Sequence, residues 1–204
     1  MHLLNRQFFI LITIVSINCK ALEIEIFFES GIKIESQNIF LKKVSNISNK
    51  KDLEFFIKDE SWIKDYSIRY IPFSSQAFIY ITNREPIFVL NNEFFVDEDL
   101  KFFPYDYSKI DIHSVYGPVT RLDNVKTLIE FFKKIESSAI EIYYNHTSGW
   151  EVATNKYKVK FGKKLTEEKL NMLNDTMNYL YDKRKVPDMI DLRYKDGVAI
   201  NYGK

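Results

Sequence analysis

The chain has 204 residues, of which 46% are hydrophobic and 28% are charged, and its formal net charge is +1. This composition is typical of a folded protein and excludes an intrinsically disordered chain. Lysine and arginine are spread along the whole sequence, so the charge pattern argues against a nucleic-acid-binding role. The single cysteine, Cys19, lies in the N-terminal apolar region, so the folded remainder contains no disulfide.

The N-terminus carries an apolar run from Phe8 to Ile17, preceded by Arg6 and followed by Lys20. Ten residues are short for a membrane span, whereas the basic start and the small residue Ala21 fit a secretory signal. A retained anchor stays open if a longer stretch spans with both flanking cations at the interfaces. In either case we expect the rest of the chain to cross a membrane.

The first third of the chain predicts the order strand, helix, strand, strand. Residues 22–28 alternate apolar and acidic side chains, which is typical of a strand. Residues 50–58 predict a helix with Ser48 or Asn49 as its cap and an apolar stripe formed by Leu53, Phe56 and Ile57. Residues 62–70 and 77–82 predict the next two strands, with Pro72 in the loop between them.

The middle of the chain predicts a hairpin, a loop-rich crossing and a helix. The hairpin covers residues 87–96, with its turn at Asn91 and Asn92. Residues 97–120 are expected to be irregular. A helix is predicted over 124–136, with Asp123 as its cap, and a short strand follows over 140–144. The stripe of this helix consists of Val125, Leu128, Ile129 and Phe132.

A second hairpin and a second helix follow. Residues 150–161 predict a hairpin around Asn155 and Lys156, in which Thr154 faces Tyr157, Val152 faces Val159, Trp150 faces Phe161 and Glu151 faces Lys160. Residues 165–185 predict an amphipathic helix with Thr166 as its cap. Its stripe consists of Leu170, Leu173, Met177 and Leu180. We expect this stripe to cover a sheet.

The last fifteen residues predict a terminal hairpin. A three-residue turn at 195–197, with Gly197 at positive φ, puts the apolar residues on one face. The expected pairs are Tyr194 with Val198, Leu192 with Ile200 and Ile190 with Tyr202. The outer edge of the final strand is then open to a partner.

No pattern in the sequence indicates catalysis. The histidines at positions 2, 113 and 146 are far apart and lack further ligands at metal-binding spacing. No nucleophile elbow, phosphate loop or dinucleotide fingerprint is present, and the acidic run Asp97, Glu98 and Asp99 is interpreted as a solvated loop. The sequence therefore favours a non-enzymatic binding or scaffolding module with no cofactor, no metal and no small-molecule substrate.

Several stretches resemble the bacterial cell division protein family FtsQ, also called DivIB. They are SWIKDYSIRY at 61–70, NREPIFVLNNEFFVDED at 83–99 and VYGPV at 115–119, followed by GWEVATNKYKVKFG at 149–162, a helix, and IDLRYKDGVAINY at 190–202. The order and spacing of these stretches carry the resemblance. It covers residues 22–202, essentially the whole exported part.

The resemblance implies an α+β fold with an N-terminal membrane segment at 1–21, a POTRA-like domain at 22–85 and a C-terminal β domain at 86–204 that ends on an edge strand. It implies a single-pass protein of the bacterial inner membrane whose bulk is periplasmic, acting as a divisome scaffold without enzymatic activity. The implied partners are FtsB-like and FtsL-like division proteins, with the FtsB-like protein adding a strand to the terminal edge.

The resemblance also implies a set of partner-binding residues: Arg193, Tyr194, Gly197, Val198, Ala199 and Tyr202. Tyr202 would be an aromatic anchor, and Arg193 would offer a fork to a partner carboxylate. Sheet packing is the alternative role for Tyr194 and Tyr202, since the expected register puts both on the apolar face. Two other classes stay open, a secreted or periplasmic enzyme or ligand-binding protein with a β-rich layout, and a transport component that carries a POTRA domain.

Overall fold

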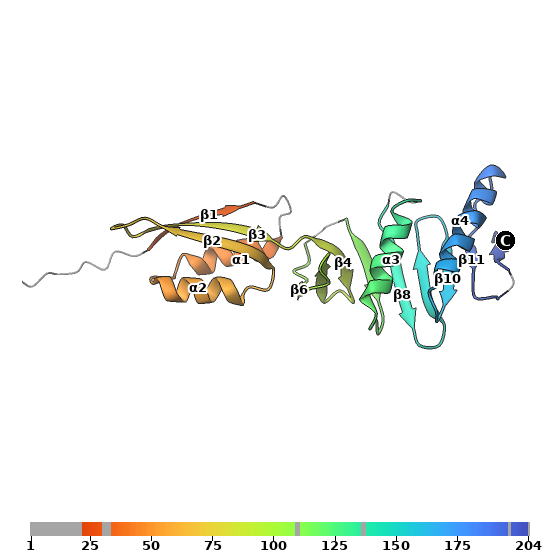
Figure 1. Cartoon of the computed structure of the whole chain (residues 1–204), viewed down its shortest axis with the longest axis horizontal. Coiled ribbons are helices and arrows are strands. Elements are labelled where there is room, and N and C mark those ends of the chain that lie inside the picture. The colour runs from red at the N-terminus through yellow and green to blue at the C-terminus, as the bar shows by residue number, and fades with distance from the viewer. Residues whose placement is uncertain (1–21, 30–33, 109–110, 136–137, 196, 204) are drawn as a thin grey trace, which may run out of the picture.

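A computed structural model describes residues 22–29, 34–108, 111–135, 138–195 and 197–203, and it has an α+β fold (Figure 1). The helices are α1 Glu35–Val44, α2 Lys50–Asp59, α3 Leu122–Phe132 and α4 Glu167–Asp182. The strands are β1 Glu23–Phe28, β2 Ile63–Tyr70, β3 Gln76–Asn83, β4 Pro86–Leu90, β5 Phe94–Asp97, β6 Phe102–Pro104, β7 His113–Tyr116, β8 Glu141–Asn145, β9 Gly149–Ala153, β10 Lys158–Gly162, β11 Met189–Asp191 and β12 Ala199–Asn201.

The first five elements form a three-stranded sheet with two helices. The strand order is β1-β3-β2, with β1 parallel and β2 antiparallel to the central strand β3. The helices α1 and α2 lie on one side of this sheet (Figure 1). Their buried residues Phe40, Leu53 and Ile57 share a core with the strands, and the Phe40 ring meets Trp62 edge to face at 5.4 Å between centroids. Burial of these large side chains is the main stabilisation of this unit.

The remaining strands form a nine-stranded sheet in the order β12-β11-β10-β9-β8-β7-β4-β5-β6. Its register aligns one row of aliphatic side chains across seven strands. The row consists of Leu90, Val115, Ile142, Val152, Val159, Ile190 and Ile200. The stripe of α3 and the buried residues of α4 belong to the same core as this row. The two helices therefore cover one face of the sheet, as two-layer packing requires.

From β7 to β11, the opposite face of the sheet is polar. Tyr143 pairs with Glu151, Glu151 with Lys160, and Lys160 with Asp191 in neighbouring strands. The Tyr116 and Tyr143 rings stack on this face, with 5.1 Å between their centroids. Alternation along these strands thus separates the helix-covered face from the polar one.

The two sheets meet at β4 and β5. Side chains from one face of these strands join the first core, and residues from the other face, such as Phe88 and Val96, join the second. Phe95 is fully buried in the first core. Next to it, Arg84 Nη1 lies 2.6 Å from Asp97 Oδ2, and Arg84 Nε donates to the Ser61 carbonyl. The chain passes from one sheet to the other between Asn83 and Pro86, but β4 and β5 contribute to both cores. The predicted division between residues 85 and 86 stays a prediction.

Most predicted elements are confirmed, and several differ. Helix α1 was not predicted, because its first turn follows Ile34, which provides no side-chain cap. The segment predicted to be irregular contains β6 and β7, each short and completed by pairing with distant strands. Helix α3 begins at Leu122, so Asp123 lies in its first turn and is not the cap. The predicted segment 1–21 lies outside the described residues.

The hairpin of β9 and β10 has the predicted turn and two of the predicted strand pairs. Val152 faces Val159 and Glu151 faces Lys160, and the Thr154 N–H donates to the Tyr157 carbonyl. The expected pair of Trp150 with Phe161 is wrong, since a bulge pairs Trp150 with the next residue, Gly162. Gly162 has φ of +77°, a conformation that favours glycine, and it marks the bulge. Helix α4 has the predicted cap, Thr166, but ends at Asp182.

Candidate partner-binding edge

The last strand, β12, lies at one end of the nine-stranded sheet and pairs antiparallel with β11. Within the described part of the chain, no other strand pairs with its outer side. The C-terminus and α4 lie at the end of the elongated molecule opposite the three-stranded sheet (Figure 1). An edge in this position is accessible to another protein.

The register of the terminal hairpin differs from the prediction. Ile190 pairs with Ile200 and Asp191 with Ala199, so the connection runs from 192 to 198 and the predicted three-residue turn is wrong. The cause is local. The Leu192 N–H donates to the Lys160 carbonyl at 2.8 Å, and its side chain is fully buried. Leu192 is thus fixed against β10, and the chain leaves β11 before the turn. Residue 196 lies outside the described residues.

The backbone of β12 presents Ile200 to the outside. The Asn201 carbonyl accepts a hydrogen bond from the Asp188 N–H at 2.8 Å, so the backbone groups of Asn201 face the β11 side. In a strand, the N–H and C=O of one residue point to the same side, and successive residues alternate. The N–H and C=O of Ile200 therefore point away from β11. Sequence reasoning missed this residue, although strand alternation was the signal that identifies it.

Four of the six predicted residues lie together. Tyr194, Gly197, Val198 and Ala199 line one shallow hollow of about 470 Å³ beside β12, together with Lys195. Val198 is half-buried and packs against the core, and Ala199 is exposed. The expected packing of Tyr194 on the apolar face is wrong, since its side chain is 58% exposed. The longer loop removes Tyr194 from the pairing and leaves it accessible.

Arg193 is already engaged within the chain. Its Nη2 lies 2.6 Å from Asp191 Oδ2, and its Nε donates to both carboxylate oxygens at 2.9 and 3.0 Å. These hydrogen bonds, opposed by burial, lower the pKa of Asp191 below its usual value. The fork predicted for a partner carboxylate is therefore occupied by Asp191, and Arg193 supports the start of the loop.

Tyr202 lies just beyond β12 and is 48% exposed. The Nζ atom of Lys185 is 5.5 Å from the centre of its ring, a cation–π contact that links the strand to the segment after α4. The predicted pairing of Tyr202 with Ile190 is wrong because Ile200 takes that position. Tyr202 therefore presents an aromatic face that the sheet does not bury.

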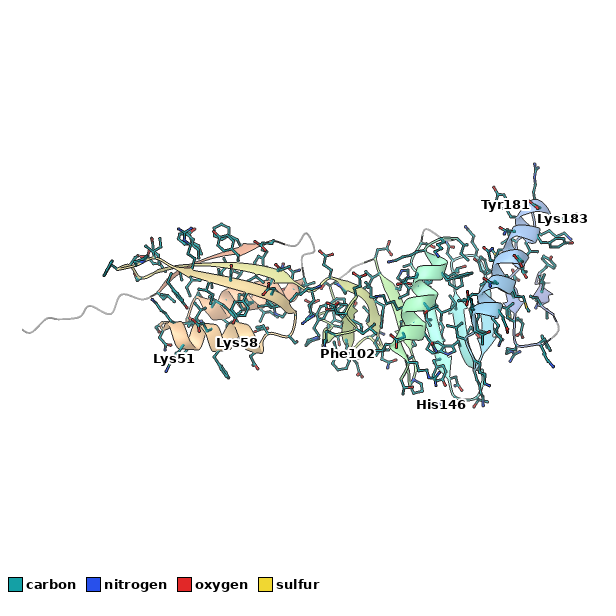
Figure 2. The ribbon with its side chains drawn as sticks, viewed as in Figure 1. Lys51, Lys58, Phe102, His146, Tyr181 and Lys183 are labelled. Atoms are coloured by element: carbon teal, nitrogen blue, oxygen red, sulfur yellow. The ribbon has the colours of Figure 1, made fainter. Side chains whose placement is uncertain are left out.

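The end of α4 adds residues that sequence reasoning did not include. Tyr179, Tyr181 and Val186 are exposed, with Tyr181 85% exposed. Tyr181 and Lys183 project from the tip of α4 (Figure 2). A second hollow of about 600 Å³ lies here, lined by Tyr181, Asp182, Arg184, Lys185 and Val186. The signal was two tyrosines outside the apolar stripe of the helix.

His113 and His146 line neither of the two hollows at this edge, and His2 lies outside the described residues. His113 Nδ1 accepts a hydrogen bond from the Ile140 N–H at 3.1 Å, and burial lowers the pKa of His113. No three His, Cys, Asp or Glu side chains gather as a metal site within the ranges that the structure describes. Over those same ranges, no helix has the length and apolar character needed to cross a bilayer.

Replacing Asp191 by asparagine tests the role of its pair with Arg193. Since the folded-state pKa of Asp191 is lowered, its ionised form stabilises the fold above the ordinary carboxyl pKa of about 3.9. That contribution is lost as the pH falls through the folded-state pKa. We expect Asp191→Asn to lower the unfolding temperature at pH 7 by roughly 2–4 °C, and the difference from the wild type to shrink in acid.

The matched control is Asp59→Asn, which changes an exposed carboxylate at the end of α2. Thermal unfolding followed by circular dichroism from pH 3 to pH 7 measures both variants. A loss in Asp191→Asn that is independent of pH would contradict the charge-based explanation.

A scan against protein-family models and a search of the curated proteins both find no match to this chain.

Proposed function

We propose that the protein is an FtsQ-like divisome scaffold of the bacterial inner membrane, without enzymatic activity, and that β12 accepts a strand from an FtsB-like partner. The observation that carries the proposal is the outward-facing backbone of Ile200 on an edge strand. Strand addition uses such main-chain groups for affinity and neighbouring side chains for specificity. An FtsL-like protein would join through the FtsB-like partner.

The architecture supports the family proposal in two ways. Residues 23–83 follow the order strand, helix, helix, strand, strand around one small sheet, which is compatible with a POTRA-like domain. Residues 86–201 form a separate sheet that ends on an edge strand. The N-terminal segment 1–21 would hold the chain at the membrane, with the remainder in the periplasm.

The side chains around the edge indicate what the partner strand carries. Tyr194, Tyr202 and Tyr181 offer exposed rings, and Lys185 and Lys195 lie among them. Aromatic residues with cations between them favour a partner segment that combines apolar and acidic side chains. The basic residues would mainly raise the association rate.

Calorimetric titration with an FtsB-like peptide tests the proposal. We expect the wild-type chain to bind the peptide saturably. Tyr202→Ala should lower the affinity about tenfold, because it removes one aromatic anchor worth roughly 1.4 kcal/mol. The control is Tyr107→Ala, which removes a tyrosine that is exposed in the loop after β6. Tyr107→Ala should bind like the wild type.

The absence of saturable binding to FtsB-like and FtsL-like peptides would contradict the proposed function. Equal binding by Tyr202→Ala and the wild type would show that Tyr202 does not contribute to the interface. Strand addition would then be tested by the Ile200→Pro variant, which changes the backbone.

A further inference from the structure

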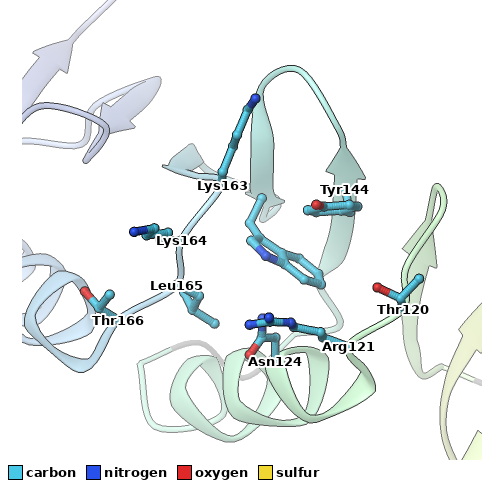
Figure 3. A pocket seen from close by; sticks show the side chains of 9 residues that line it. Thr120, Arg121, Asn124, Tyr144, Lys163, Lys164, Leu165 and Thr166 are labelled. Atoms are coloured by element: carbon cyan, nitrogen blue, oxygen red, sulfur yellow. The ribbon is translucent and has the colours of Figure 1, made fainter.

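A pocket of about 410 Å³ lies between the start of α3, the strands β8 and β9, and the segment that leads into α4 (Figure 3). Arg121 directly precedes α3 and Asn124 lies in its first turn, while Lys163 and Lys164 come from the segment after β10 (Figure 3). The complete lining consists of Thr120, Arg121, Asn124, Tyr144, Trp150, Lys163, Lys164, Leu165 and Thr166. These residues are distinct from those that line the hollows beside β12 and the tip of α4.

The lining is basic, and its cations have no acidic counterpart. Arg121, Lys163 and Lys164 line the pocket, and no carboxylate does. In the described part of the chain, none of these three side chains makes an ion pair or a hydrogen bond. Asp123 and Glu167 lie in the first turns of the two helices but outside the lining. The uncompensated charge attracts an anion.

Uncharged hydrogen-bond donors line the same pocket. The indole of Trp150 is only 3% exposed and lines the pocket, yet its N–H has no hydrogen-bond partner among the described residues. Its N–H is therefore available to a ligand or water that enters the pocket. The side chains of Thr120 and Asn124 line the pocket too and make no hydrogen bond with the residues described.

The N-terminus of α3 opens toward this pocket. Arg121 is its N-cap residue and provides no side-chain cap, and of the first-turn N–H groups that of Asn124 donates to the Arg121 carbonyl at 3.2 Å. The α4 helix differs, because the Thr166 side chain accepts from the Lys169 N–H. A helix start without a side-chain cap, a guanidinium and an indole N–H together fit an oxyanion.

We propose that this pocket binds the phosphate group of a small phosphorylated molecule. Arg121 and the start of α3 would hold the phosphate, with Lys163 and Lys164 at the rim. A doubly charged phosphate matches three unpaired cations better than a singly charged carboxylate. The rings of Tyr144 and Trp150, whose centroids are 4.7 Å apart, would border the organic part.

Calorimetry on the full chain in non-ionic detergent, at constant ionic strength, tests the site with inorganic phosphate and glycerol 3-phosphate as probes. We expect saturable one-to-one binding of glycerol 3-phosphate, and Arg121→Gln should weaken it about tenfold, as loss of one charge-assisted hydrogen bond predicts. Quenching or enhancement of tryptophan fluorescence by the probe is a second readout, since Trp150 lines the pocket.

The matched control is Arg69→Gln, which removes an exposed arginine from β2 and changes the net charge equally. Tighter binding of glycerol 3-phosphate than of inorganic phosphate supports an organic ligand, and equal binding supports recognition of the phosphate alone. Non-saturable binding overturns the proposal. So does equal weakening by both substitutions, with folding of each variant verified by circular dichroism.

Discussion

Replacing Ile200 by proline is expected to lower the affinity for an FtsB-like peptide at least about 30-fold, equivalent to roughly 2 kcal/mol. Proline removes the backbone N–H, and at this position that N–H points away from β11. The pairing of β12 with β11 keeps its own hydrogen bonds, so the hairpin is retained. Calorimetric titration of the peptide into both proteins measures the difference.

The control is Ile200→Ala, which shortens the half-buried side chain but keeps the N–H. It should bind the peptide within a few-fold of the wild type if main-chain hydrogen bonds supply the affinity. If proline and alanine weaken binding equally, the side chain of Ile200 carries the interaction and the strand-addition proposal fails at this residue.

Replacing Phe95 by alanine is expected to destabilise the fold by about 3–5 kcal/mol, the usual cost of emptying a buried phenylalanine site. Phe95 is fully buried, and its ring meets Tyr105 edge to face at 4.9 Å and Phe103 at 5.2 Å. It also belongs to the core that contains Phe40 of α1. The loss therefore affects the junction between the two sheets, and denaturant unfolding measures it.

Phe94→Ala provides the matched control, since Phe94 is the preceding residue of β5 and its side chain is 41% exposed. It meets Phe102 in an edge-to-face contact at the surface. We expect this substitution to cost less than about 1 kcal/mol. Similar losses in the two variants would contradict the account of a core shared across the junction.

The sequence was informative where periodicity and a cap coincide. The stripe of α3 and the cap of α4 at Thr166 follow directly from three- and four-residue spacing and a capping side chain. The hairpin turn at Asn91 and Asn92 was predictable because asparagine tolerates the positive φ that both residues adopt. The α+β fold follows from these local signals.

Elements that depend on distant contacts were not predictable. Helix α1 has an uncapped start at Ile34, and its burial against Trp62 and β3 stabilises it. Strands β6 and β7 have three and four residues, too few for a pattern, and they form by pairing with β5, β4 and β8. Tertiary packing decides such segments.

The position of the candidate edge at the last strand was predicted correctly, but the residue pairing of the terminal hairpin was not. Alternation indicated an open final strand, whereas the hydrogen bond from Leu192 to Lys160 and the pair of Asp191 with Arg193 decided where β11 ends. Both are contacts made in three dimensions. As a result, Tyr194 lies in an exposed loop and not in the predicted strand, and Ile200 is the residue whose backbone N–H and C=O point outward.

Amide hydrogen exchange at Ile200, measured by NMR with and without an FtsB-like peptide, tests the strand-addition account most directly. The account predicts that the Ile200 N–H exchanges at least about tenfold more slowly in the complex. The N–H groups of Ala199 and Asn201 face β11 and should change little. Unchanged exchange at Ile200 in a saturated complex would contradict the account.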